Sequence, residues 1–299
     1  MKQNTIGYKI KGKIIRFSAN FLSDKNYLRL YFRHRVGYKL NLDNPQTFNE
    51  KLQWLKLYDR REEYTKMVDK VDAKKYVATI IGEQHIIPTL GVWEDVEDID
   101  WERLPNQFVI KATDDSGGVI VCKDKSKLDI KQAKKKLQRK KSYCKYNKEY
   151  IYKGIKHRII AEKYMVDESG YELKDYKIFC FNGEPKVLFV ATDRQKRGEE
   201  TKFDFYDIDW HHLPFINGHP NNPNPIEKPK HFDEMLDIAR KLSKGIPQVR
   251  IDLYNCNGII YFGEITFFHW SGTKAFEPEE WDYKLGKMIT LPTTKSNIQ

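Results

Sequence analysis

The chain has 299 residues and a mass of 35.6 kDa, and its 53 Lys and Arg against 42 Asp and Glu give a net charge of +11. This length allows a sizeable hydrophobic core without stabilising crosslinks. A hydrophobic content of 40% beside 32% charged residues excludes a membrane-spanning chain, and 13% aromatic residues exclude a disordered polymer. Because no signal peptide is visible either, we expect a globular protein of the cytoplasm with one large or two modest domains.

The positive charge is concentrated in two segments. Residues 1–40 contain ten Lys and Arg with one acid, and residues 123–158 contain fifteen with three acids. The second segment has apolar residues at helical spacing, which predicts a lysine-covered helix. Such segments are typical of a solvated surface or of a site for polyanions such as nucleotide phosphates or an acidic glycan. No RNA-binding or zinc-finger motif is visible, so nucleic acid is not an expected partner.

The first sixty residues are predicted to be helical. Apolar residues recur there at helical spacing, at Ile10, Ile14, Phe17 and Phe21. This stripe either packs against the body of the protein or, because basic residues flank it, lies on the inner face of a membrane. A later helix is predicted from Thr47, where Glu50 three residues on completes a capping box.

Further along the chain, strand patterns replace helical ones. A helix is predicted over residues 64–81. Strand-like runs follow in residues 86–96, 107–124, 158–166, 174–193 and 248–268. Asn-Gly pairs at 182–183 and 257–258 predict tight hairpin turns within the last two runs, and another helix is predicted between those runs over 231–246.

Two strand regions have polar residues suited to nucleotide chemistry. Lys111 closes an apolar strand and precedes a glycine loop, a combination typical of polyphosphate binding or of a plain hairpin turn. Near the C-terminus, alternation puts Arg250 and Asp252 on one face of a strand. It puts Glu264 and Thr266 on one face of the partner strand. Two carboxylates on adjacent strands can hold Mg²⁺ while the guanidinium binds phosphate or oxyanion charge, although ion pairing at a solvent face is the alternative.

These segments recur in the order and spacing of the ATP-grasp enzymes. The matching residues are Lys111 with its Ser-Gly-Gly loop and residues 161–165, 175–177, 250–252 and 264–266. More narrowly, the runs FNEKLQWLKLYDR, IPTLGVWED, DYKIFCFNGEPK and RIDLYNCNGIIYFGEITFF resemble the TupA-like ATP-grasp branch, which is named for teichuronopeptide biosynthesis. The resemblance covers residues 45–292 and implies an α+β fold in which two α+β subdomains clasp ATP.

The resemblance divides the chain into four parts. They are a helical basic segment at 1–62, an N-terminal ATP-grasp subdomain at 63–160, a C-terminal subdomain at 161–292 and a flexible tail at 293–299. The α/β domain that usually precedes the ATP-binding region is missing, and the helical basic segment stands in its place. The usual substrate platform is therefore not expected here.

The resemblance also assigns nucleotide-binding residues. Lys74 matches the first nucleotide lysine, with Lys70 and Lys75 as competitors, and Lys111 matches the second. The loop that closes over the β- and γ-phosphates matches Ser116, Gly117 and Gly118. The hinge that recognises adenine matches Glu162, Lys163, Tyr164 and Met165. Asp175 matches the acid that binds the ribose.

The catalytic and metal residues implied by the resemblance follow in the C-terminal subdomain. Lys177 points toward the phosphates, and Arg250 matches the arginine on the developing oxyanion. Asp252 and Glu264 match the magnesium carboxylates. Thr266 takes the place of the usual asparagine as the third metal ligand, and one or two Mg²⁺ ions remain open alternatives.

The activity implied by the resemblance is amide formation, in which ATP activates a carboxylate as an acyl phosphate and an amine attacks it. We therefore expect a ligase that uses ATP and Mg²⁺ to attach an amino acid to an acidic or lipid-linked glycan, or a peptide precursor, of the bacterial cell surface. One alternative is a phosphotransferase acting on a glycan hydroxyl. Others are a glycosyltransferase-associated protein of polysaccharide biosynthesis, for which Asp207 and Asp209 give a weak signal, and a non-enzymatic binding module.

Overall fold

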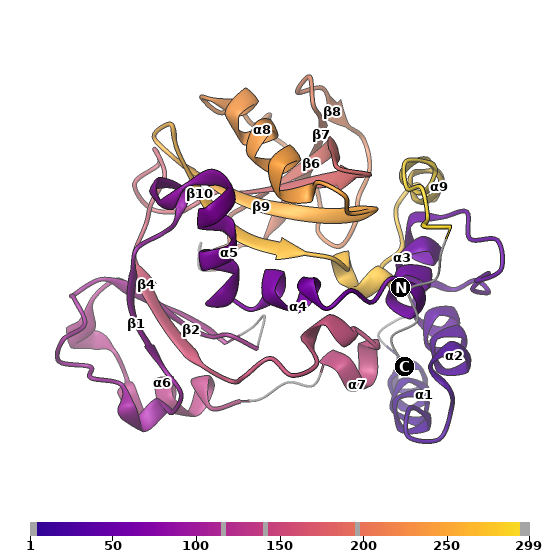
Figure 1. The fold of residues 1–299 in the computed structure, drawn as a ribbon, viewed down its shortest axis with the longest axis horizontal. Coiled ribbons are helices and arrows are strands. Elements are labelled where there is room, and N and C mark those ends of the chain that lie inside the picture. The colour runs from indigo at the N-terminus through magenta and orange to yellow at the C-terminus, as the bar shows by residue number, and fades with distance from the viewer. Residues whose placement is uncertain (1–4, 115–117, 140–142, 195–197, 294–299) are drawn as a thin grey trace.

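The computed structural model describes residues 5–114, 118–139, 143–194 and 198–293 of the chain. The helices of this part are α1 (Ile6–Ser18), α2 (Asp24–Val36), α3 (Phe48–Tyr58), α4 (Glu63–Val68), α5 (Asp72–Ile81), α6 (Ile130–Leu137), α7 (Tyr143–Asn147), α8 (Phe232–Ser243) and α9 (Glu280–Lys287). Figure 1 shows α1, α2, α3 and α9 together at one side of the molecule, beside the strands.

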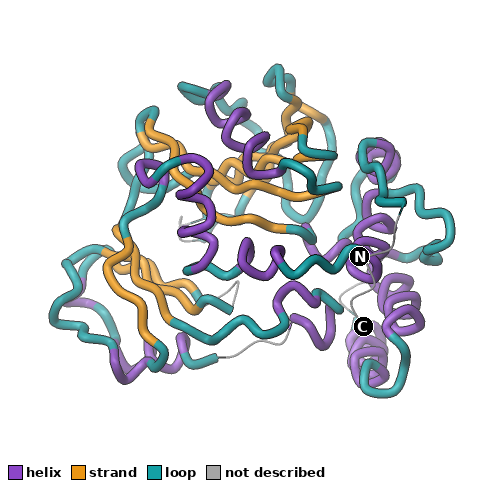
Figure 2. Tube along the Cα trace, in the orientation of Figure 1, coloured by secondary structure: helices purple, strands orange, loops and turns teal. Residues whose placement is uncertain are grey.

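The described strands form two antiparallel sheets, drawn in orange in Figure 2. The smaller sheet, in the order β1–β4–β2–β3, contains β1 (Thr89–Trp93), β2 (Phe108–Ala112), β3 (Val119–Cys122) and β4 (Ile159–Lys163). The larger sheet, in the order β10–β9–β5–β6–β7–β8, contains β5 (Asp175–Phe181), β6 (Glu184–Thr192), β7 (Lys202–Asp207), β8 (His212–Leu213), β9 (Gln248–Cys256) and β10 (Ile259–Thr266). The mixture of helices and antiparallel sheets is the predicted α+β class.

The two faces of the larger sheet have different neighbours. Helix α8 covers one face, whereas α4, α5 and the smaller sheet lie toward the other (Figure 1). Side chains alternate along β5, and Cys180 points toward α8, where its sulfur lies 3.8 Å from the carbonyl oxygen of Ala239. The odd-numbered residues of β5 therefore face the smaller sheet, on the side where the sequence predicts the charged residues.

The predicted hairpin turns are confirmed. Asn182 and Gly183 join β5 to β6 with φ angles of 54° and 85°, and Asn257 and Gly258 join β9 to β10 with 56° and 93°. Two consecutive left-handed residues are the signature of a type I′ turn, which suits the twist of a two-residue hairpin. The first turn sets the register of β5 with β6, and the second sets the register at the start of the β9–β10 hairpin.

Helix α3 fixes the C-terminal part of the chain through polar contacts. Its predicted capping box is confirmed, with Glu50 N donating to Thr47 Oγ1 at 3.1 Å and Thr47 N donating to the Glu50 carboxylate at 3.2 Å. Asn49 donates from its backbone N–H and its side chain to the Asp282 carboxylate at 2.9 and 2.8 Å. Gln53 donates to the carbonyl of Gly272 at 2.7 Å. Helix α3 thereby holds the segment that follows β10.

The continuous helix predicted over residues 64–81 is wrong, because α4 ends at Val68 and α5 begins at Asp72. The Asp69 carboxylate accepts hydrogen bonds from the backbone N–H groups of Val71 at 2.8 Å and Asp72 at 3.0 Å. These bonds satisfy donors that the start of a helix leaves without intrahelical partners. The break changes the direction of the chain before Lys74.

The apolar stripe of α1 is exposed. The exposed fractions of Ile10, Ile14, Phe17 and Phe21 are 53%, 64%, 66% and 73%. Only Ile15 of this helix is buried. Packing of the stripe against the body of the protein, one of the two sequence-based interpretations, is therefore wrong for the described structure. None of the described helices is long and apolar enough to cross a membrane.

Helix α9 approaches the start of α3 closely at Gly286. A Cβ atom there would lie 2.2 Å from the carbonyl oxygen of Gln46 and 2.7 Å from the backbone nitrogen of Phe48. We expect Gly286→Ala to lower the free energy of unfolding by about 1–3 kcal/mol, because backbone atoms must move to relieve the clash. Gly7→Ala is the control, since its Cβ would meet nothing within 4 Å. Urea unfolding of both variants measures the difference, and equal stabilities would contradict this packing.

Candidate active site

Three neighbouring strands of the larger sheet present charged side chains in register. Lys177 in β5 pairs with Asp252 in β9, and Asp252 pairs with Glu264 in β10. One step along the strands, Arg250 pairs with Thr266. A register shift between Phe262 and Glu264 allows Arg250 and Asp252 of β9 to share one face with Glu264 and Thr266 of β10. Within each strand the alternation is as predicted. We call Lys177, Asp252, Glu264 and Arg250 the charge row.

Arg250 lies at the centre of the charge row. Its Nε and Nη2 donate to the two oxygens of Asp252 at 2.6 and 2.7 Å. Nη2 also lies 3.1 Å from Thr266 Oγ1 and 3.3 Å from Glu264 Oε1. The remaining Nη1 lies 2.8 Å from Nδ1 of His269. The guanidinium is therefore fixed at each of its three nitrogens, which orients it precisely within a buried site.

The two carboxylates of the charge row have different environments. Asp252 is fully buried, and this burial raises its pKa to about 6 although Arg250 and Lys177 oppose the change. Glu264 has 47% of its side chain exposed. Burial acts to raise the pKa of Glu264, but Lys177 and Arg250 outweigh it and hold this pKa well below its usual range. Glu264 is thus an ionised carboxylate that is accessible to a ligand.

A second ionic cluster joins α5 to the smaller sheet. Glu162 in β4 accepts from Lys74 at 2.5 Å and from Lys111 at 2.6 Å. Burial acts to raise the pKa of Glu162, but the two lysines, Lys111 foremost, lower it overall. Lys74 also donates to the carbonyl oxygen of Ile87 at 2.7 Å. The structure thus brings together three of the residues that the sequence assigns to nucleotide binding.

The competitors of Lys74 lie elsewhere. Lys70 donates to the carbonyl of Thr113 at 3.0 Å, and Lys75 is exposed on α5. In the hinge after Glu162, Lys163 is exposed, while Tyr164 and Met165 are half-buried. Of the predicted glycine loop, Gly118 is buried. Ser116 and Gly117 lie outside the described residues.

Asp175 lies at the start of β5 and is buried. Its Oδ2 accepts from Lys177 at 2.7 Å and from Arg194 at 2.5 Å. Its Oδ1 is also buried and receives no hydrogen bond from any residue that the structure describes. A buried carboxylate oxygen without a donor is costly unless a ligand or water supplies one.

A cavity of about 410 Å³ adjoins the Arg250 end of the charge row. Its lining includes Arg250, Glu264 and Thr266 of the larger sheet together with Lys70, Arg16 and Arg35. We call it the Arg250 cavity. Asp175 thus lies at one end of a path along the strands, at the start of β5, which follows the predicted hinge. The charge row comes next, and this cavity lies at the other end.

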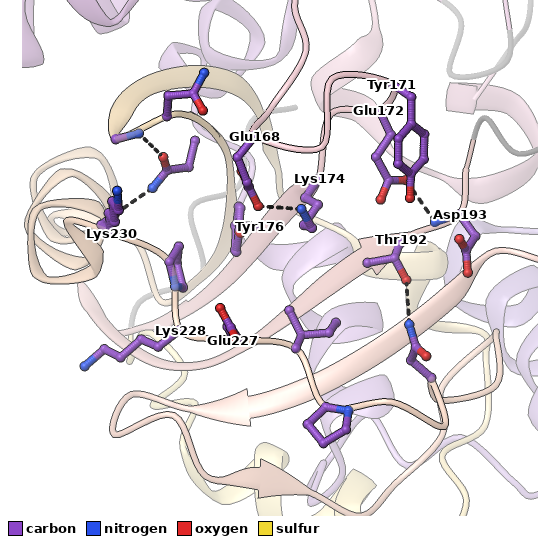
Figure 3. Close-up of a pocket in the computed structure, with 17 residues that line it drawn as sticks. Glu168, Tyr171, Glu172, Lys174, Tyr176, Thr192, Asp193, Glu227, Lys228 and Lys230 are labelled. Atoms are coloured by element: carbon purple, nitrogen blue, oxygen red, sulfur yellow. Dashed lines mark hydrogen bonds and ion pairs between the residues drawn. The ribbon is translucent and has the colours of Figure 1, made fainter.

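Another cavity, of about 490 Å³, lies on the opposite face of the larger sheet (Figure 3). Tyr176 and Thr192 line it, and they alternate with the residues that face the smaller sheet. Two of its charged groups, Glu168 and Lys174, lie 2.6 Å apart, and Figure 3 shows them pointing toward one another. This cavity is therefore separate from the candidate active site.

A family model described as TupA-like ATPgrasp matches residues 50–290. The chain belongs to the TupA-like ATP-grasp family. Membership confirms the predicted family and the predicted α+β ATP-grasp fold. No curated protein sequence matches the chain.

Similar solved structures include the ATP-grasp ligase PsnB complexed with minimal precursor, Mg and ADP, at 12% identity and a TM-score of 0.39. The match covers 73% of this chain, which spans only 57% of the PsnB chain. D-alanine–D-alanine ligase from Bacillus anthracis has 16% identity and a TM-score of 0.40, over 82% of this chain and 69% of that one. D-cycloserine synthetase DcsG has 14% identity and a TM-score of 0.41, over 75% and 70%.

The sequence of this TupA-like protein did not reveal the role of His269. Its Nε2 lies 2.9 Å from Asn217 Oδ1, and burial together with Arg250 holds its pKa well below the usual value. The ring is therefore neutral, with Nδ1 accepting from Arg250 and Nε2 donating to Asn217. Its position three residues after Thr266 was the available signal. Arg194, the partner of Asp175, was missed as well.

We expect His269→Ala to lower the kcat of ATP turnover by about tenfold or more while the KM for ATP changes little, because Arg250 loses its third fixed contact. His269→Asn keeps an acceptor near Arg250 and is expected to retain more activity than His269→Ala. Steady-state kinetics beside circular dichroism spectra checks both variants. Equal kcat values in wild type and His269→Ala would contradict a positioning role.

Proposed function

We propose that the chain is a Mg²⁺- and ATP-dependent carboxylate–amine ligase that forms an amide through an acyl phosphate. The observation that carries this proposal is the charge row, in which two cations and two carboxylates lie in register on one face of a sheet. Such a row can hold a metal-bound triphosphate and also stabilise the charge that develops during phosphoryl transfer.

The oxygen ligands suit Mg²⁺. Asp252 and Glu264 offer carboxylates and Thr266 offers a hydroxyl, which are the hard ligands that this ion prefers. The ionised, accessible state of Glu264 supports its assignment. Bound there, Mg²⁺ would screen the negative charge of the phosphates. Whether one or two ions bind is left to metal titration.

The nucleotide would lie along the strands, from the hinge to the Arg250 cavity. Residues 162–165 would receive the adenine, and the Asp175 Oδ1 without a donor would accept from a ribose hydroxyl. Lys74 and Lys111 would bind phosphate oxygens, and these bonds would replace part of their contact with Glu162. Ser116, Gly117 and Gly118 would close over the phosphates. This arrangement takes residues 63–160 and 161–292 as the two ATP-grasp subdomains.

The chemistry requires Arg250 and Lys177 to act in sequence on one reacting group. A substrate carboxylate attacks the γ-phosphorus, ADP leaves, and Lys177 neutralises the phosphate charge. An amine then attacks the acyl carbon, inorganic phosphate leaves, and Arg250 donates to the oxyanion that forms. The bidentate bond between Arg250 and Asp252 keeps the guanidinium in place during both steps.

The substrates belong to this proposal too. We take the amine donor as an amino acid and the acceptor as an acidic or lipid-linked glycan, or a peptide precursor, of the bacterial surface. The Arg250 cavity supports an acidic acceptor because, among the residues that the structure describes, its lining has four cations, Arg16, Arg35, Lys70 and Arg250, against three acids, Asp114, Glu149 and Glu264. The proposed ligase reaction would take place in the cytoplasm.

We expect Glu264→Gln to lower ATP turnover by about tenfold or more without loss of folding, because a metal carboxylate is replaced by a weaker ligand. We expect Asp252→Asn to lower ATP turnover as well. The control is Asp209→Asn, an exposed acid in the turn between β7 and β8. ADP release and thermal unfolding are measured for all three, and normal turnover in both Glu264→Gln and Asp252→Asn would refute the assignment.

An assay of the products separates a ligase from a kinase. With ATP, a glucuronic acid glycan and hydroxylamine, a ligase releases ADP and inorganic phosphate and leaves a hydroxamate on the carboxylate, because hydroxylamine traps the acyl phosphate. Mass spectrometry of the glycan measures this. A phosphorylated glycan without free phosphate would identify a phosphotransferase and overturn the ligase proposal.

The exposed stripe of α1 supports peripheral contact with the inner membrane face. Basic residues near anionic headgroups contribute about 1 kcal/mol each, which gives reversible, salt-sensitive binding. We expect co-sedimentation with phosphatidylserine vesicles at low salt and about a tenfold weaker binding for Phe17→Ser/Phe21→Ser, whose side chains are 66% and 73% exposed. Ile259→Ser, which changes an apolar residue 56% exposed on β10, is the control. Vesicle binding equal in all three proteins, or absent in wild type, would refute the contact.

A further inference from the structure

The Arg250 cavity has one wall that lies outside the matched family region. The family model begins at residue 50, whereas Arg16 belongs to α1 and Tyr31 and Arg35 belong to α2. These helices belong to the segment that stands in place of the usual preceding domain, where the sequence led us not to expect the usual substrate platform. The N-terminal segment is therefore part of the lining of the candidate site, in addition to its surface stripe.

Each acid that is described in the cavity lining has a basic side chain or an imidazole as a neighbour. Asp114 lies 2.7 Å from His157 Nδ1, Glu149 lies 3.7 Å from Lys56 Nζ, and Glu264 lies 3.3 Å from Arg250. Arg16 of α1 and Arg35 of α2 add positive charge to the same described lining. The resulting excess of cations favours an anionic ligand, and guanidinium groups bind carboxylate and phosphate oxygens well.

The remaining wall of the cavity has a specific and strained shape. Trp270 and Ser271 line it with left-handed φ angles of 48° and 57°, which are unfavourable for residues other than glycine. Lys56 holds this segment in place, because its Nζ donates to the Ser271 carbonyl oxygen at 2.8 Å and to Ser271 Oγ at 2.7 Å. Trp270 is 43% exposed and offers an aromatic surface beside the cations.

The volume of the cavity also restricts its ligand. About 410 Å³ falls within the range of roughly 300–1,000 Å³ that is usual for pockets holding small organic ligands, and far exceeds the space for an isolated ion. A lining that contains both an aromatic side chain and arginines suits a ring that has an anionic substituent.

We infer that Arg16 and Arg35 determine acceptor specificity by binding an anionic group, carboxylate or phosphate, on a ring-containing acceptor. This inference rests on the proposed ligase function. The acceptor would lie in the Arg250 cavity, with its anionic group at α1 and α2 and its reacting group toward Arg250. Residues outside the matched family region would thus select the substrate of a site that the family region builds.

The test measures binding of three sugars by isothermal titration calorimetry to the protein saturated with ADP and Mg²⁺. The probes are glucuronate, glucose 6-phosphate and glucose, which separate a carboxylate, a phosphate and a neutral ring. We expect at least one anionic sugar to bind about tenfold or more tightly than glucose. Arg16→Ala/Arg35→Ala is expected to lose that preference, and Arg16→Lys/Arg35→Lys to keep part of it.

Lys13→Ala and Arg33→Ala are matched controls, because these basic residues are exposed on α1 and α2 and do not line the cavity. They are expected to bind the anionic sugar as wild type does. Binding of ADP, measured first, tests the proposed function separately. If ADP binds but neither anionic sugar outcompetes glucose, or if Arg16→Ala/Arg35→Ala retains the preference, the inference is overturned while the proposed function stands. If Arg16→Ala/Arg35→Ala fails to fold, Arg16→Lys/Arg35→Lys decides the question. A weaker preference for the anionic sugar in that variant, with an unchanged preference in the two controls, supports the inference.

Discussion

The fully buried carboxylate of Asp252 is the constraint on which the candidate site depends. An ionised group at this depth is strongly unfavourable without close counter-charges, and removing one partner of a buried ion pair typically costs about 3–5 kcal/mol. Arg250 and Lys177 supply these charges on the same and the adjacent strand. The register of β5, β9 and β10 meets this requirement, and His269, which follows β10, bonds to Arg250. Binding of a metal and phosphates would redistribute charge that the protein already holds in place.

The site joins parts of the chain that are distant in sequence. The polar residues of α3 hold the turn after β10, and that turn positions His269 against Arg250. The ionic cluster around Glu162 connects α5 to the smaller sheet, at the opposite end of the candidate nucleotide path. Motif residues that lie far from one another in sequence thus act on one reaction site. The run from Phe48 to Arg60 builds this support, with Gln53 buried and bonded to the turn.

Local sequence patterns predicted much of this structure. Alternation predicted which residues share a face within each of the last two strands, and the Asn-Gly pairs predicted both hairpins. The pairing of Asp252 with Glu264 also needs the register shift between Phe262 and Glu264, which alternation does not predict. Tertiary contacts decided what local patterns could not. The side chain of Asp69 ends the long predicted helix, and the neutral tautomer of His269 depends on a partner 52 residues away. The exposure of the α1 stripe and the entry of α1 and α2 into the Arg250 cavity likewise depend on packing that helical periodicity does not encode.

The measurement that tests the central claim most directly is the affinity for the non-hydrolysable analogue AMP-PNP with and without Mg²⁺, by isothermal titration calorimetry on the wild-type protein. If the charge row binds a metal-bound triphosphate, Mg²⁺ tightens binding by about tenfold or more, because Asp252 and Glu264 then meet phosphate charge through the ion rather than directly. Equal affinity with Mg²⁺ and with EDTA, or no binding in either, would contradict the account of this face of the sheet as a nucleotide site.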